Sequence, residues 1–365
     1  MMAALAFLFV FCVGAVGYWL LRKVHFPNPG LLGAMVATGT LNIVGWYPHF
    51  ATGHVSFAAS AVIGIMLGRQ VTRDILVKIR SLALPVFIHT AGMLLLSLLA
   101  GFFLYHVLKG SNVSIGTALI SGTAGGLTEM ILFGLSIHAD VGVIAFIQLV
   151  RICLFLAMIP HVLHLDRWLS SDQTSPAVAT SPNISPSLAE AGPLQPTDKA
   201  TFTRTTYIPL VLLAIAGAWT GNYLGVPAGA MLGSMLACGS FALLIGREYS
   251  FDNRIRLLAQ IALGAIMGQR ITPEMISLLE ALIFPALLST GIMFVGCMGL
   301  AFLMHKTTGF GLATCFLCSA PAGLSQAALV ADEVGADPLT ATVFHTARLV
   351  GIVAFYPWLI LPFLD

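Results

Sequence analysis

Long apolar segments recur along the chain and are separated by short polar stretches. Six of them occupy the N-terminal part, at about residues 3–21, 29–45, 55–69, 82–107, 114–136 and 140–164. Six more follow at about residues 207–224, 228–246, 257–270, 281–304, 308–331 and 338–363. Many approach the length of about 20 residues that a helix needs to cross the hydrocarbon core of a membrane. The pattern predicts an all-α polytopic membrane protein.

The second set of segments repeats the first in register. Gly64-x-x-x-Gly68-x-x-x-Thr72 returns 200 residues later as Gly264-x-x-x-Gly268-x-x-x-Thr272. Gly126-Leu127-Thr128-Glu129 returns 197 residues later as Gly323-Leu324-Ser325-Gln326. The sequence therefore predicts a duplicated membrane domain, an architecture that is typical of secondary transporters.

A stretch rich in Ser, Thr and Pro separates the two repeats. It spans residues 167–203 and can bury little apolar surface, so we expect it to be a flexible linker. The first membrane repeat then comprises residues 1–166, and the second comprises residues 204–365.

Composition narrows the class of protein and its partners. Hydrophobic residues make up 58% of the chain and charged residues only 9%, against about 25% charged in soluble domains. No basic cluster is dense enough for a nucleic-acid surface, and the cysteines all lie within apolar segments, where we expect them to pack as small hydrophobic residues. We therefore expect the lipid bilayer and a small molecule or ion as partners, with a homo-oligomer left open. We expect no nucleic acid, no cofactor, no metal and no enzymatic activity.

The positions of Lys and Arg decide between two topologies. If all six segments of each half cross the membrane, the positive charge divides nearly evenly between its two sides. If one segment per half enters without simply crossing, each half crosses five times and the second half is inverted. Only Lys109 and Arg270 then face outward. Thirteen basic residues then face the cytoplasm: Arg22, Lys23, Arg69, Arg73, Lys78, Arg80, Arg167, Lys199, Arg204, Arg247, Arg254, Arg256 and Lys306. We therefore expect two inverted repeats of about five transmembrane helices, with a cytoplasmic linker and both termini outside.

The fifth segment of each half contains residues that interrupt a helix. These are Gly122-Thr123-Ala124-Gly125-Gly126 in the first half and Ala320-Pro321-Ala322-Gly323 in the second. Each half is therefore expected to contain one broken or re-entrant helix. Backbone that a break frees at membrane depth must face protein or a water-filled cavity, which makes both breaks candidate solute sites.

Polar side chains follow both breaks. Thr128-Glu129 follows Gly125-Gly126, and Ser325-Gln326 follows Pro321 and Gly323. A solute held there would meet backbone donors, two hydroxyls, one carboxylate and one amide. Because a carboxylate is costly at membrane depth, Glu129 is the candidate for carrying a proton or holding a cation. The alternative is that the glycines only permit close packing and that Glu129 lies in an aqueous loop at the membrane surface.

Two arginines occupy equivalent positions in the following segments. Arg151 lies three residues after Gln148, and Arg348 lies three residues after His345; all four belong to the candidate site. Buried guanidinium groups could bind an anionic solute bidentately, or they could clamp the carbonyl groups of the broken helices.

Two aspartates, Asp140 and Asp337, directly precede the arginine-bearing segments. A carboxylate at this position can accept hydrogen bonds from the first backbone N–H groups of a helix. We expect each to cap a helix N-terminus, with ion binding as the alternative.

These motifs resemble the repeat signature of the AbrB-type bacterial membrane protein family, in which a domain of this length is duplicated. The matching residues are Gly122-x-x-Gly125-Gly126-Leu127-Thr128-Glu129, Ala139-Asp140 and Gln148-x-x-Arg151, with their equivalents in the second half. The resemblance implies a multi-pass protein of the bacterial inner membrane. The family is similar in organisation to the superfamily of cation–proton antiporters and anion or organic-acid transporters with crossing broken helices. The sequence departs from the family's Pro-Gly-Gly at Thr123-Ala124-Gly125, and from its acidic residue at Gln326.

The resemblance also carries two functional labels, regulator of gene expression and ammonia monooxygenase. The second would need copper or iron ligands, and the sequence shows no such set. The first cannot mean direct DNA reading, because the sequence predicts no soluble domain of adequate size. We therefore expect a secondary transporter whose small solute binds between the two broken helices at mid-membrane. The alternative is a membrane-embedded sensor or regulator that affects gene expression indirectly.

Overall fold

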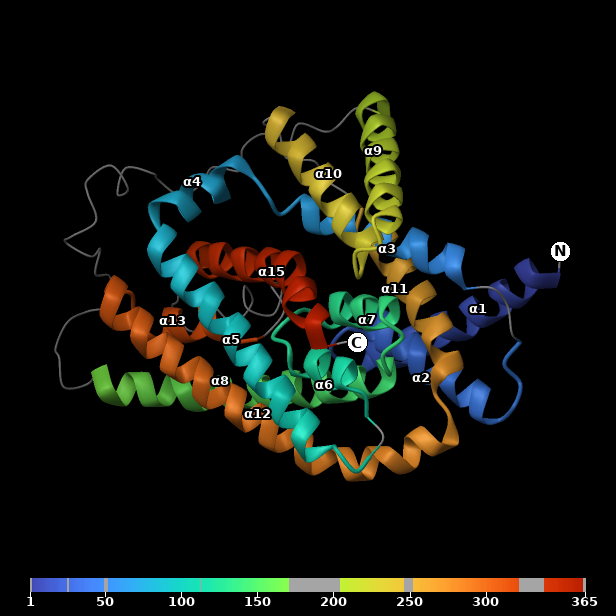
Figure 1. Ribbon diagram of the computed structural model, residues 1–365, viewed down its shortest axis with the longest axis horizontal. Coiled ribbons are helices and arrows are strands. Elements are labelled where there is room, and N and C mark those ends of the chain that lie inside the picture. The colour runs from blue at the N-terminus through green and yellow to red at the C-terminus, as the bar shows by residue number, and fades with distance from the viewer. Residues whose placement is uncertain are drawn as a thin grey trace.

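The computed structural model describes residues 2–24, 26–48, 52–111, 113–170, 204–245, 252–321 and 338–363. Within these ranges every regular element is a helix, which confirms the predicted all-α class (Figure 1). The first half contains α1 (Met2–Lys23), α2 (Pro29–Ile43), α3 (Gly53–Gly68), α4 (Arg73–Ser81), α5 (Ala83–Val107), α6 (Ile115–Gly122), α7 (Leu127–Ser136) and α8 (Val141–Ser170). The second half contains α9 (Arg204–Tyr223), α10 (Gly229–Ile245), α11 (Asn253–Met267), η1 (Gly268–Arg270), α12 (Pro273–Thr308), α13 (Leu312–Ser319), α15 (Pro338–Ile360) and η2 (Leu361–Phe363).

Most helices begin and end close to the predicted apolar segments, and the clearest difference concerns the fourth one. In the first half a short charged helix, α4, precedes α5. Its start is fixed by Thr72, whose hydroxyl accepts a hydrogen bond from the N–H of Ile75 at 3.3 Å. The equivalent residues of the second half form the beginning of the single long helix α12. The apolar pattern missed α4 because the helix carries Arg73, Lys78 and Arg80.

Several helices have the length and surface of membrane spans. Four described helical stretches are long and apolar enough to cross a membrane: Leu5–Lys23, Ala83–Val107, Leu278–Thr308 and Thr340–Phe363. Shorter apolar helices cover Gly53–Gly68, Leu127–Ser136, Val141–Phe155 and Gly229–Ile245. Large apolar side chains such as Phe87 on α5 and Val295 on α12 are mostly exposed. These features are those of a helical membrane protein.

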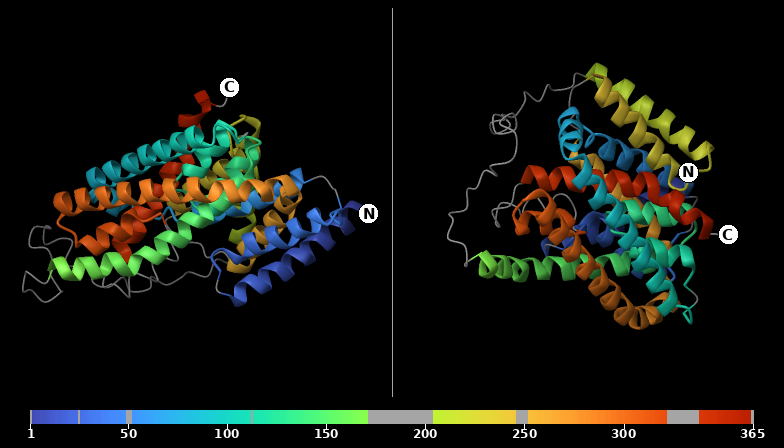
Figure 2. Two further views of the ribbon diagram at one scale, coloured as in Figure 1. Left: turned by 90° about the horizontal axis from the view of Figure 1, so that it is seen from below. Right: turned by 60° about the vertical axis from the view of Figure 1, so that its left-hand side comes forward.

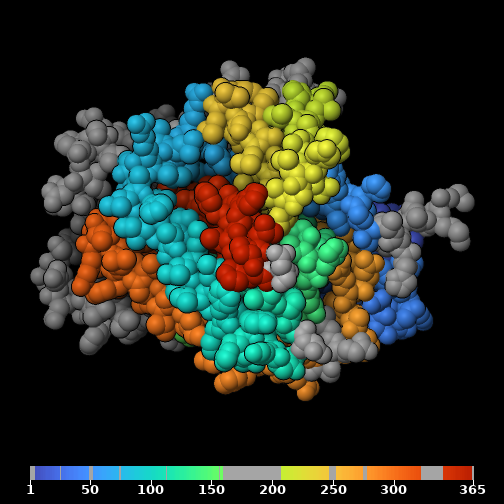
Figure 3. Space-filling model, in the orientation of Figure 1, coloured from blue at the N-terminus to red at the C-terminus, as the bar shows by residue number. Residues whose placement is uncertain are grey.

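The helices pack into two units, each built from both halves of the sequence (Figures 1 and 2). The six-helix unit consists of α1, α2, α3, α9, α10 and α11, in which α2 packs against α11 and α3 against α10. The broken-helix unit consists of α5, α6, α7, α8, α12, α13 and α15, in which α5 contacts α15 and α12 contacts α8. On the face shown in Figure 3, α15 (red) lies between α5 and the α9–α10 pair. The halves are therefore interleaved in space.

Repeated glycines bring the helices of the six-helix unit into close contact. A Cβ atom on Gly64 of α3 would lie 2.5 Å from the carbonyl oxygen of Met231 on α10. A Cβ atom on Gly264 of α11 would lie 2.2 Å from the carbonyl oxygen of Leu31 on α2. The two contacts are equivalent under the 200-residue repeat. Absence of a side chain at these glycines therefore sets the distance between helices from opposite halves.

Substitution of one of these glycines is expected to loosen the unit. Gly264→Ala places a methyl group against a backbone carbonyl that cannot rotate away, so we expect a loss of about 1–3 kcal/mol in the free energy of unfolding. Gly291→Ala is the matched control, because a Cβ atom on this helical glycine of α12 meets nothing within 4 Å. Thermal unfolding of the purified protein should show a lower Tm for Gly264→Ala only. An equal Tm for both variants would contradict the close-packing argument.

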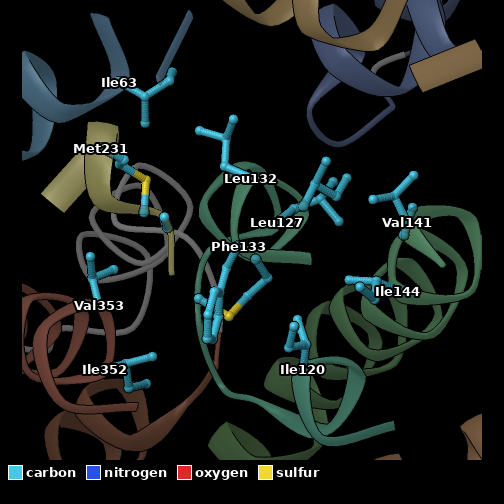
Figure 4. Packing of buried hydrophobic residues seen from close by; sticks show 14 of the residues in the cluster. Ile63, Ile120, Leu127, Leu132, Phe133, Val141, Ile144, Met231, Ile352 and Val353 are labelled. Carbon is cyan, nitrogen blue, oxygen red and sulfur yellow. The ribbon is translucent and has the colours of Figure 1, made fainter. Parts of the chain in front are cut away.

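Helix α7 lies between the two units. Leu132 of α7 lies beside Ile63 of α3 and Met231 of α10 in a shared apolar cluster (Figure 4). Phe133 packs edge-on against Tyr356 of α15, with ring centroids 6.5 Å apart. At its end, α7 contacts the start of α10, where the hydroxyl of Ser136 accepts a hydrogen bond from the N–H of Ala228 at 2.8 Å. The segment after the expected break is therefore the contact between the two units.

Candidate functional site

The helix of the fifth segment is interrupted in the first half, as expected. Helix α6 ends at Gly122, Thr123 (φ −75°, ψ 133°) and Gly126 (φ −74°, ψ 144°) are extended, and α7 begins at Leu127. The N–H of Ala124 donates to the hydroxyl of Ser97 on α5 at 3.0 Å. The freed backbone therefore finds a partner inside the protein, as a break at membrane depth requires.

The equivalent helix of the second half, α13, ends at Ser319. Ala320 is extended (φ −62°, ψ 129°) and is followed by the buried Pro321. Pro321 is the equivalent of Ala124 and has no N–H, while Cys297 stands where the first half has Ser97. The backbone donor and the hydroxyl that receives it are thus absent together in the second half.

Gln148 closes the end of α6 from the neighbouring helix α8. Its amide nitrogen donates to the carbonyl oxygens of Ile120 at 3.3 Å and of Thr123 at 3.2 Å. Its amide oxygen accepts a short hydrogen bond from Nη2 of Arg151. Both side chains are buried. Gln148 therefore links the arginine to the broken backbone without direct contact between the two.

His345 and Arg348 close the end of α13 from α15 in a different way. His345 Nε2 lies 2.9 Å from the carbonyl oxygen of Leu317, and Arg348 Nη1 donates to the carbonyl oxygen of Ala320 at 2.7 Å. Arg348 Nη2 lies 2.8 Å from His345 Nδ1, which must accept because a guanidinium only donates. The imidazole is therefore neutral, with its one proton on Nε2. Of the two roles considered for the arginines, Arg348 has the clamping contact, whereas Arg151 reaches no carbonyl group among the described residues.

The Gln148–Arg151 pair and the His345–Arg348 pair meet in the interior of the broken-helix unit. Arg151 and Arg348 act on each other electrostatically, and the thiol of Cys297 on α12 acts on both. Tyr356 of α15 donates its hydroxyl hydrogen to the carbonyl oxygen of Leu119 on α6 at 2.8 Å. Helix ends from both halves are therefore joined in one buried polar centre.

A second cluster of polar side chains surrounds the start of α7. The side chain of Glu129 is buried, and its Oε2 occupies the space that a Cβ atom on Gly126 would need, at 2.0 Å. The carboxylate lies at the N-terminal end of a helix, where its negative charge is favoured, and Arg256 of α11 acts on it electrostatically. The carboxylate is therefore enclosed by protein.

Residues of the six-helix unit complete this group. Gln260 of α11 donates from its amide nitrogen to Thr128 Oγ1 at 3.3 Å and to Asn28 Oδ1 at 3.2 Å. Gln260 is buried, and Asn28 directly precedes α2 in the left-handed conformation (φ 51°). The polar group therefore spans the boundary between the two units.

The candidate residues fall into two neighbouring sets. Gln148, Arg151, His345 and Arg348 surround the ends of α6 and α13. Gly125 and Gly126 directly precede α7, and Thr128 and Glu129 lie in its first turn. Asp140 caps α8, since its Oδ1 accepts from the N–H groups of Gly142 at 3.0 Å and Val143 at 3.2 Å. The candidates Gly323, Ser325, Gln326 and Asp337 lie outside the described residues.

The sequence did not single out Gln260, Ser97, Tyr356 or Cys297. Gln260 offers a signal in retrospect, because it is an amide within the otherwise apolar run Leu257–Leu263. The other three look like ordinary members of apolar helices, and only the packing of α5, α12 and α15 against the breaks shows their place. His89 of α5 is fully buried, packs edge-on against Phe344 and has no hydrogen-bond partner on either ring nitrogen among the described residues.

Comparison with known proteins identifies the family. The family model described as "Transition state regulatory protein AbrB" matches residues 1–109 and 51–363. The chain is 24% identical over 339 residues to "Putative regulator AbrB" of Escherichia coli (strain K12), covering 92% of this chain and 89% of that protein. It is 22% identical over 302 residues to "Uncharacterized protein YhjN" of Bacillus subtilis (strain 168), covering 81% and 75%. No solved structure matches. The chain belongs to the AbrB family, as its repeat motifs indicated.

Proposed function

We propose that the protein is a secondary transporter of a small solute in the inner membrane of a bacterial cell. The observation that carries the proposal is the interruption between α6 and α7, which concentrates buried polar groups in an otherwise apolar protein. Polar groups at such depth are costly and mark solute or ion pathways in membrane proteins.

The arrangement of the two units suggests how access could alternate. Helix α7 carries Thr128 and Glu129 and is joined to the six-helix unit by the hydrogen bond that Gln260 donates to Thr128. A displacement of the broken-helix unit along this contact would exchange the side from which a solute reaches the break. Glu129 is the group whose proton occupancy would couple this movement to pH.

We propose further that the two halves are inverted, with five crossings each. This topology is supported by the basic residues assigned to the cytoplasm and by α5 and α12, which lie together and run in opposite directions (Figures 1 and 2). Equivalent helices of inverted repeats must run oppositely.

Cysteine labelling in intact cells tests the topology. We expect Ser181→Cys in the linker to be protected from a membrane-impermeant thiol reagent, because the linker is assigned to the cytoplasm. Lys109→Cys, at the end of α5, should be labelled from outside. The unsubstituted chain with its six cysteines gives the background. Labelling of Ser181→Cys from outside would reject the inverted arrangement.

Reconstitution in vesicles tests the function. Purified protein in vesicles with an imposed pH gradient is exposed to carboxylates, amines, ammonium and neutral amides in turn. A solute that dissipates the gradient only in the presence of protein supports transport. Saturable binding without flux for every solute that binds would instead support a sensor. That second candidate is favoured by the name of the Escherichia coli relative, which describes a regulator.

A further inference from the structure

The two arginines differ in their hydrogen bonds to the neighbouring backbone carbonyl groups. Gln148 and His345 are equivalent positions, and so are the carbonyl groups of Thr123 and Ala320, all related by 197 residues. A glutamine amide carries two N–H donors, whereas a neutral imidazole carries one. Gln148 therefore donates to the carbonyl oxygens of both Ile120 and Thr123. His345 donates to the carbonyl oxygen of Leu317 alone, and the carbonyl oxygen of Ala320 accepts from Arg348 instead.

This difference leaves Arg151 with an unused donor. Its Nη2 is bound to the amide oxygen of Gln148, but its Nε has no hydrogen-bond partner among the described residues. The side chain is buried, with 3% of its surface exposed. Among the described residues, the groups that act on it electrostatically are Cys297, Arg348 and Tyr356, and none of these is a carboxylate. A buried guanidinium with neither a counter-charge nor a full set of acceptors is energetically costly unless another group supplies them.

We propose that Arg151 binds the anionic group of the solute and that this group is a small carboxylate. The planar guanidinium fork presents parallel N–H donors that match the two oxygens of a carboxylate. Arg348 reinforces the positive field but is held in place by Ala320 and His345, and Gln148 fixes the orientation of Arg151. The proposal rests on the solute site proposed above and names the chemical class of its ligand.

Thermal stability of the full-length protein in detergent tests the binding. We expect sodium acetate, lactate or succinate to raise the Tm above that seen with equal ionic strength of sodium chloride, with ammonium chloride and sodium phosphate as comparison salts. Arg151→Gln should weaken the apparent affinity for the effective carboxylate by about tenfold to a hundredfold, because a charge-assisted donor is removed. Arg151→Lys keeps the charge without the fork, so its affinity for the carboxylate should lie between those of the unsubstituted protein and Arg151→Gln. This variant also serves if Arg151→Gln does not fold.

The outcomes separate this inference from the transport proposal. The inference is overturned if no carboxylate exceeds chloride, if phosphate or ammonium alone does so, or if both Arg151 variants bind the carboxylate as the unsubstituted protein does. Carboxylate binding that depends on Arg151 without flux in vesicles would uphold the inference and reject transport. Flux of an amine that Arg151→Lys leaves unchanged would uphold transport and reject the inference.

Discussion

Replacement of Glu129 by Gln is expected to abolish the pH dependence of solute binding and of coupled flux while the protein remains folded. The carboxylate is buried at the start of α7, where burial opposes ionisation and the helix terminus and Arg256 favour it. Gln keeps the size and the hydrogen-bonding capacity of the side chain but cannot ionise. Solute binding measured from about pH 5 to about pH 9 should therefore become flat in the variant.

An exposed carboxylate supplies the control for this experiment. Glu280 on α12 is exposed, so Glu280→Gln removes the same charge from the lipid- or solvent-facing surface and should leave the pH profile unchanged. Arg256→Gln should displace the profile without flattening it, because it removes the positive charge that acts on Glu129. If Glu129→Gln keeps the profile of the unsubstituted protein, the carboxylate takes no part in coupling.

Replacement of Arg348 by Met is expected to destabilise the protein strongly. It removes the donor to the carbonyl oxygen of Ala320 and to His345 Nδ1, and both acceptors remain buried. Hydrogen bonds to charged donors contribute about 1.5–3 kcal/mol, so a loss of about 3 kcal/mol or more is expected. This is a large part of the stability of an ordinary protein. Arg151→Met should cost less, because Arg151 supports no backbone carbonyl among the described residues.

A second substitution should recover part of this loss. In His345→Gln the amide could donate to both Leu317 and Ala320, as Gln148 does to their equivalents. Arg348→Met should then cost about 1–2 kcal/mol less in the His345→Gln protein than in the unsubstituted one. Tm values and the yield of monodisperse protein for the four members of this double-mutant cycle measure the difference. Additive effects would show that the histidine does not oblige Arg348 to serve as a clamp.

The apolar pattern and the repeat predicted most helices because both depend on local composition and register. Glycines at 122, 125 and 126 predicted the interruption of the fifth segment, since a helix loses stability at such a run. The preference of carboxylates for helix N-termini predicted that Asp140 caps a helix, and it does cap α8. Helix α4 escaped prediction because its charges hide a short amphipathic helix from a search for apolar runs.

The candidate site could be predicted only in outline, because its contacts join residues far apart in the chain. Gln260 reaches Thr128 across 132 positions, and no local pattern indicates that α11 faces α7. The different roles of the two arginines depend on which hydrogen atoms Gln148 and His345 can donate to the carbonyl groups that the fold places beside them. The sequence showed the substitution of Gln by His, but its effect on the neighbouring arginine follows only from geometry.

The glycine contacts of the six-helix unit bear on how such a chain could have originated. Gly64 packs against Met231 and Gly264 packs against Leu31, so each half supplies the backbone surface that the glycine of the other half contacts. A polypeptide of one half alone would lack a neighbour for the glycine of its α3-like helix. In a pair of identical polypeptides, each copy would supply that neighbour to the other, so the contact would form twice. The contacts between α2 and α11 and between α3 and α10 thus have the form of a homodimer interface enclosed within a single chain. An ancestral gene of half this length could have encoded that dimer, and fusion of two copies would have joined its subunits without altering how they fit.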